Sequence, residues 1–84
     1  MNYVNNANLN TIAFYAFRYA LGRMTYAVDD VVTILISLKD ELNGRIKHKI
    51  CDEIKEAIKM NRAGHKCDLE DWKRLLKEFS DDNS

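Results

Sequence analysis

The sequence predicts an all-α protein, a compact bundle of about four short helices held together by one structural zinc ion. Three observations support this prediction. The 84 residues include no proline, and their three glycines, Gly22, Gly44 and Gly64, are spaced like helix punctuation. Apolar residues between these glycines recur at steps of three and four, the helical period. Every histidine and cysteine of the chain lies between residues 48 and 67.

The first helix is expected between Asn10 and Gly22, with Asn10 or Asn8 as its N-cap. Its spacing predicts an inward face made of Ile12, Ala13, Ala16, Phe17, Ala20 and Leu21.

The second helix is expected after Thr25, a candidate N-cap, with Asp29 and Asp30 in the first turn, where carboxylates suit the helix dipole. The β-branched run at residues 31–36 would also suit a strand. Apolar spacing that continues to Leu42, followed by an Asn-Gly stop, favours a helix. Its predicted inward face comprises Val28, Val31, Val32, Leu35, Leu38 and Leu42.

Two further helices are expected after Gly44. The first should run from about Arg45 to Met60, and the second should begin at Asp68 as an N-cap, with Asp71 three residues later in a variant of the capping box. The inward residues are predicted to be Ile46, Ile50, Ile54, Ala57 and Ile58 in the first, and Leu69, Trp72, Leu75, Leu76 and Phe79 in the second.

Composition indicates one globular domain spanning residues 1–84, with residues 1–8 and 80–84 expected to fray. The net charge is zero, and 31% of residues are charged while 46% are hydrophobic. This balance is typical of a small folded domain and disfavours direct nucleic-acid binding. A chain of this length buries only a modest core, so a metal ion would add useful stability.

Membrane insertion and secretion are not predicted. The longest apolar run, residues 31–38, is far shorter than the roughly 20 residues that cross a bilayer. The first ten residues lack the basic and apolar regions of a secretory signal, so we expect a cytoplasmic protein, and host cell cytoplasm if a phage encodes it. Its cysteines should then be reduced, which favours metal binding, catalysis or ordinary burial over a disulfide.

The histidine and cysteine cluster predicts a structural zinc site with His48, Cys51, His65 and Cys67 as ligands. His48 and Cys51 are three residues apart on a predicted helix, and His65 and Cys67 lie in the loop that follows. Two thiolates and two imidazoles suit tetrahedral zinc, and four protein ligands leave no position for substrate. We therefore predict no enzyme activity.

Alternatives to this ligand set remain open. The loop must return most of the length of the helix after Cys51, which requires that helix to end near Lys59. Otherwise two chains would share the ion, or Asp52 or Asp68 would replace one ligand. Cys51 could also be an ordinary small buried residue, with the others at the surface. The weakest alternative is a catalytic Cys67 activated by its neighbours.

Candidate partner-binding residues occur in two places. Tyr15, Arg18, Arg23 and Tyr26 supply aromatic rings and guanidinium groups, which are common in protein interfaces. The segment after Cys67 is acidic and could dock on a basic protein, with Glu70 and Asp71 as its first candidates. The structural alternative is that the tyrosines pack at the rim of the core and the arginines pair with neighbouring aspartates.

Two phrases, "FRYALGRMTYAV" at residues 17–28 and "DWKRLL" at residues 71–76, together with the histidine and cysteine pairs, give the chain a resemblance to small phage-encoded metal-binding anti-CRISPR proteins. The resemblance implies a non-enzymatic inhibitor that binds a type II RNA-guided nuclease and prevents DNA loading. Its partner would be that CRISPR effector, and the sequence leaves a homodimer open. Alternatives are an oligomeric sponge or sensor for a nucleotide signal and a small DNA-binding module.

Overall fold

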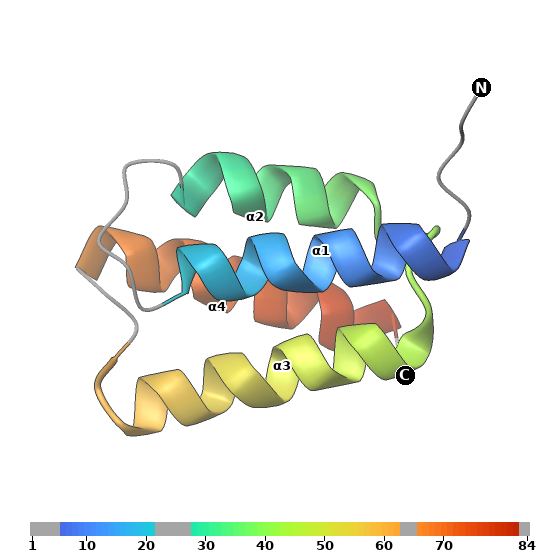
Figure 1. The fold of residues 1–84 in the computed structure, drawn as a ribbon. Helices are drawn as coiled ribbons and strands as arrows, with labels where there is room; N and C mark the ends of the chain where they lie inside the picture. The colour runs from blue at the N-terminus through green and yellow to red at the C-terminus, as the bar shows by residue number, and fades with distance from the viewer. Residues whose placement is uncertain (1–5, 22–27, 63–65, 83–84) are drawn as a thin grey trace.

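A computed structural model describes the chain at residues 6–21, 28–62 and 66–82, with side chains at 8–21, 28–62 and 68–80. These parts form four helices and no strand, which confirms the predicted helical bundle (Figure 1). The helices are α1 (Asn6–Ala20), α2 (Val28–Ser37), α3 (Gly44–Lys59) and α4 (Lys66–Asp82). None of them is long and apolar enough to cross a membrane.

The four helices pack as a ring in which, over the described residues, each helix contacts two others. Helix α1 contacts α2 and α3, and α4 contacts the same two helices from the other side. Helices α1 and α4 therefore lie diagonally across the bundle, with α4 behind α1 in Figure 1. This arrangement leaves the outer sides of α1 and α2 next to each other on one face of the molecule.

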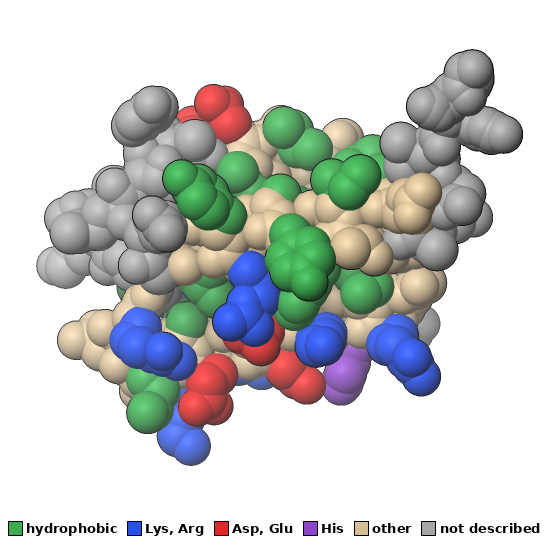
Figure 2. Space-filling view, viewed as in Figure 1, with side chains coloured by type: hydrophobic (Ala, Val, Ile, Leu, Met, Phe, Trp, Pro, Cys, Tyr) green, Lys and Arg blue, Asp and Glu red, His purple; other side chains and the backbone are tan. Residues whose placement is uncertain are grey.

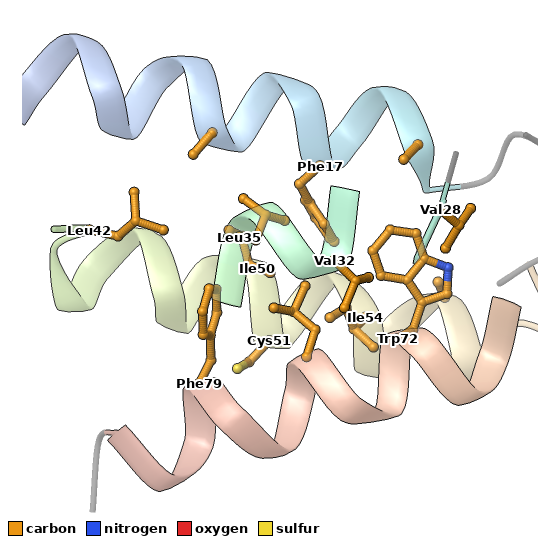
Figure 3. Packing of buried hydrophobic residues seen from close by; sticks show 14 residues of the cluster. Phe17, Val28, Val32, Leu35, Leu42, Ile50, Cys51, Ile54, Trp72 and Phe79 are labelled. Atoms are coloured by element: carbon orange, nitrogen blue, oxygen red, sulfur yellow. The ribbon is translucent and has the colours of Figure 1, made fainter. Parts of the chain in front are cut away.

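Large side chains from all four helices fill the centre of the ring (Figure 3). Phe17 from α1 and Trp72 from α4 meet there edge to face, with ring centroids 5.6 Å apart and planes at 90°. Such a contact adds about 0.5–1.5 kcal/mol to the apolar burial of the two rings. The other fully enclosed side chains are those of Val28, Val32, Leu35, Ile50, Ile54, Leu75 and Phe79.

Helix α2 ends at Ser37, five residues earlier than the apolar spacing predicts. The Ser37 hydroxyl donates a hydrogen bond to the carbonyl of Ile34 (2.7 Å), and the Leu38 N–H is shared between the carbonyls of Ile34 and Leu35. These bonds tighten the last turn, and residues 38–42 continue as turns. Leu42 is still buried in the core, which confirms its predicted burial, but it lies beyond the end of α2.

Polar contacts fix the junction between α2 and α3. The Asn43 side chain accepts a hydrogen bond from the Ile46 N–H (2.9 Å), which makes Asn43 the N-cap of α3. The backbone N–H of Asn43 donates to the side chain of Asn10 (2.9 Å), 33 residues earlier in α1. The buried Lys47 donates from Nζ to the carbonyl of Lys39 (2.9 Å). These bonds join α1 to the turn that starts α3.

The end of α3 agrees with the boundary that the zinc prediction required, since the helix stops at Lys59. Asn61 follows in the left-handed conformation, with φ at 58°. The N–H groups of Asn61 and Arg62 donate to the carbonyls of Ile58 and Ala57, respectively, which is the Schellman arrangement. Asn61 therefore has the capping role that the glycine spacing suggested for Gly64, which lies outside the described residues.

The predicted start of the last helix needs correction. Helix α4 begins at Lys66, so Asp68 lies in its first turn and is not its N-cap; the carboxylate there still suits the helix dipole. Residues 6–8 belong to α1 and residues 80–82 to α4, within the two ranges that were expected to fray.

Candidate functional site

The predicted zinc ligand His48 lies on the outer side of α3. Its side chain is 73% exposed, and Nε2 lies 3.4 Å from Oδ2 of Asp52, one turn further along the helix. Such an exposed pair contributes little to stability. His48 therefore points to solvent and not towards the interior of the bundle.

Cys51, three residues later, points the other way. It is only 4% exposed, and its Sγ lies 4.0 Å from the carbonyl oxygen of Leu76 and 3.9 Å from Oγ of Ser80, both on α4. Figure 3 shows the sulfur facing α4 beside Phe79. Burial is the main reason that the pKa of the Cys51 thiol is raised. Cys51 thus matches the alternative reading of a small buried residue.

Of the other two predicted ligands, the structure describes only the backbone of Cys67. Cys67 belongs to the first turn of α4, nine residues before Leu76. At about 1.5 Å of rise per residue, roughly 13 Å of helix separates Cys67 from Leu76, the residue of α4 whose carbonyl Cys51 contacts. His65 lies outside the described residues. Among the residues that the structure does describe, no three potential ligands gather around one point.

The predicted partner residues on α1 differ in their surroundings. Tyr15 is 68% exposed. Arg18 lies 3.6 Å from Glu53 of α3, through Nη1 and Oε2, and its Cζ is 5.9 Å from the centre of the Phe14 ring. Nζ of Lys49 also lies near that ring centre, at 4.9 Å. Arg18 therefore helps to join α1 to α3, while Tyr15 faces outward. Arg23 and Tyr26 lie outside the described residues.

The predicted acidic partner residues lie near the start of α4, diagonally across from α1. Glu70 is exposed, whereas Asp71 is half-buried and lies 3.7 Å from Nη2 of Arg74, through its Oδ1. Partial burial is the largest cause of the raised pKa of Asp71, and Arg74 opposes it. The structure thus does not gather the described members of the predicted partner set, Tyr15, Arg18, Glu70 and Asp71, into one patch.

A further surface, of which the sequence singled out only Tyr15, lies on α1 and α2. Five large apolar residues with described side chains are more than half exposed, and four of them lie here: Ile12, Tyr15 and Tyr19 on α1, and Ile34 on α2. We call these four residues, with the groove between the two helices, the α1–α2 face. Figure 2 shows hydrophobic side chains spread over this part of the molecule. The fifth residue, Met60, lies apart, at the end of α3.

The groove in the α1–α2 face has an almost wholly apolar lining and a volume of about 100 Å³. Pockets for drug-sized molecules usually enclose about 300–1,000 Å³, so this groove is too small for a nucleotide. It is large enough for one or two apolar side chains from another protein. Its lining consists of Leu9, Ile12, Ala13, Ala16, Val31, Ile34, Leu35 and Leu38.

Charge is distributed unevenly between the two halves of the bundle. Helix α1 has one charged residue, Arg18, and α2 has two, Asp29 and Asp30, in its first turn. Helices α3 and α4 contain eight and ten, not counting His48. Figure 2 shows the resulting row of acidic and basic side chains below the apolar area. The α1–α2 face is therefore both apolar and nearly uncharged, unlike the mixed charged surface of α3.

The sequence of α1 did indicate an apolar outer surface, but the helical spacing assigned some of these residues to the core. The spacing assigned Ile12 and Ala16 to the inward side of the first helix, but both are exposed. Apolar residues in α1 recur at too many positions for one stripe, and the helix has a single charge. A helix that is apolar over most of its circumference is expected to be covered on more than one side.

A scan against models of known protein families, a search of curated proteins and a search of solved structures each found no match for the chain.

Proposed function

We propose that the protein acts without catalysis, by binding another protein through the α1–α2 face. The observation that supports this proposal is the concentration of exposed apolar side chains there, around a groove sized for side chains. Contiguous apolar surface rimmed by polar residues is typical of protein-binding sites. Tyrosines such as Tyr15 and Tyr19 supply large contact areas at low entropic cost, as in many interface hot spots.

The chemistry of the face favours one kind of partner. A groove between two helices, lined by aliphatic side chains and lacking charge, accepts the apolar side of a helix, with residues spaced by three, four and seven positions as anchors. A highly charged ligand would lose its hydration on this face without gaining counter-charges. The partner is therefore a protein that presents apolar side chains, and not a nucleic acid.

The sequence resemblance makes a type II RNA-guided nuclease the first target to test. An inhibitor bound to such an effector would cover a surface needed for DNA loading and would act in a fixed stoichiometry, without turnover. The α1–α2 face would supply the contact, and the charged surface of α3 and α4 would set the orientation.

The test is a binding assay between the untagged protein and purified effector–guide complexes, at micromolar concentration and moderate salt. Ile12→Glu places a charge in the face, and Met60→Glu makes the same kind of change at an exposed apolar site outside it. We expect binding of the unmodified chain and Met60→Glu, and a loss of roughly tenfold or more for Ile12→Glu. Absence of binding to any effector would overturn the nuclease as target. Equal binding by both variants would show that the α1–α2 face is not the binding surface.

A further inference from the structure

The α1–α2 face contains both halves of a helix-in-groove contact. One half is the groove between α1 and α2. The other is the outer stripe of α1, where Ile12, Tyr15 and Tyr19 follow one another at steps of three and four residues and are 56%, 68% and 64% exposed. This i, i+3, i+7 spacing is the anchor pattern of helices that bind in apolar grooves. The stripe adjoins the groove, since Ile12 belongs to both.

A surface with these two halves side by side is self-complementary. When two copies meet about a two-fold axis, the stripe of each α1 enters the groove of the other copy, and both grooves are filled by one contact. Ala13 and Ala16 line the groove from α1. Their small side chains let the second helix approach closely, while Ile34 closes the opposite side from α2.

Electrostatics permits this pairing. The whole chain has zero net charge, so two copies do not repel each other at long range. Within the face, the only charge on α1 is that of Arg18, which already lies beside Glu53 of α3. The two charges of α2 lie in its first turn, and neither side chain belongs to the lining of the groove. Among the described residues, the lining of the groove has no charged side chain, so filling the groove removes no carboxylate or ammonium group from water.

From these observations we propose that the free protein forms a homodimer through the α1–α2 face, with α1 of each copy in the groove of the other. The inference rests on the proposed function, because it names the occupant of the same face when no target is present. A tighter-binding target would displace the second copy. The dimer is measured on the protein alone, so its failure and the failure of target binding are separate results.

The size of the face sets the strength of the dimer. Helix α1 has 15 residues and is therefore about 22 Å long. Two helices side by side are roughly 18 Å wide, so the footprint is on the order of 400 Å² per copy. This area is below that of the standard stable interface, about 800 Å² per partner. The expected dimer is thus weak and reversible, with a dissociation constant in the micromolar range.

The test is sedimentation equilibrium of the full untagged chain in reductant and chelator, from low to high micromolar concentration. We expect the mean mass to rise from 9.8 kDa towards twice that value as concentration increases. Ile12→Glu and Ile34→Glu should each weaken the dimer roughly tenfold or more, whereas Met60→Glu should leave it unchanged. Circular dichroism establishes that each variant is folded.

A second measurement uses Ala16→Cys in a Cys67→Ser background. Ala16 is exposed beside the groove, so mild oxidation should link the dimer through this position, and Met60→Cys in the same background should not be linked. A monomer at every concentration would overturn the proposal. So would a dimer that dissociates in chelator, which would indicate a metal ion shared between chains, or one that Met60→Glu weakens as much as Ile12→Glu.

Discussion

The rings of Phe17 and Trp72 bridge the diagonal of the bundle. They meet edge to face at 5.6 Å, although among the described residues the backbones of α1 and α4 make no close contact. Aromatic side chains therefore span the centre of the ring of helices, and neither ring is exposed by more than 1%. Shortening either one would leave a void that no backbone movement fills easily.

Phe17→Ala should consequently lower the free energy of unfolding by about 3–5 kcal/mol, through lost burial and the cavity left behind. Phe14→Ala is the matched control, because Phe14 is on the same helix but only half-buried, and we expect a smaller loss. Urea unfolding followed by far-UV circular dichroism measures both. A loss for Phe17→Ala no larger than for Phe14→Ala would contradict the central role of this pair.

Burial of the Cys51 thiol predicts slow chemical modification. In a Cys67→Ser background, a thiol reagent at about pH 8 should react with Cys51 at least a hundredfold more slowly in the native protein than in urea, because modification requires α3 and α4 to separate. Comparable rates in the native and unfolded protein would show that the α3–α4 contact opens readily.

The raised pKa of Cys51 also predicts a pH dependence of stability. Since burial raises the pKa above 9.0 in the folded state, the unfolded chain loses the proton first as pH increases. The stability associated with the neutral thiol is complete below pH 9.0 and is lost above it. Between about pH 8 and 10, Cys67→Ser should lose more unfolding free energy than the same protein with Cys51→Ala added. Equal losses of unfolding free energy in the two proteins would contradict a contribution from the Cys51 thiol.

The left-handed conformation of Asn61 predicts that one substitution is nearly neutral and another is destabilising. Asn61→Gly should change the unfolding free energy by no more than about 0.5 kcal/mol, because glycine adopts positive φ without strain. Asn61→Ala should cost about 1 kcal/mol, since its Cβ disfavours that region. Urea unfolding measures the unfolding free energies of the two variants. If Asn61→Ala were as stable as Asn61→Gly, the Schellman cap would contribute nothing measurable.

The zinc site stays a prediction, and the packing of α3 sharpens its test. Because Sγ of Cys51 is enclosed by α4 and His48 points to solvent, we expect Cys51→Ser to leave the zinc content of the untagged protein unchanged in elemental analysis. Cys67→Ser is the companion variant. About one zinc per chain that is lost in both variants would instead support the four-ligand set and require α3 and α4 to pack differently around Cys51.

Much of the fold was predictable because apolar spacing is a strong signal in the charged helices. In α3 and α4 the charges leave a single apolar stripe, and the predicted inward residues are indeed buried or half-buried. Exact ends were less predictable, because the end of α2 depends on a serine hydroxyl and on Lys47 from α3. Such contacts between distant segments leave no local pattern in the sequence.

The surface was harder to predict than the core for a related reason. Spacing distinguishes inward from outward positions only when outward positions are polar, and α1 breaks that condition at Ile12 and Tyr19. Cys51 and His48 also show that sequence spacing alone does not determine which way a side chain points. A separation of three residues is compatible with a shared ligand, yet the two side chains lie on either side of the boundary between interior and solvent.

The hydrogen bond from the Asn43 backbone to Asn10 has a consequence for the order of assembly. The Asn43 amide is held by a side chain of α1 and precedes the hydrogen-bonded turns of α3. Its proton can therefore be protected from exchange with solvent deuterium only while α1 is seated against the turn. The exchange rate of this one amide, compared with those in the middle of α3, would report how often the first helix leaves the bundle while the other three stay folded.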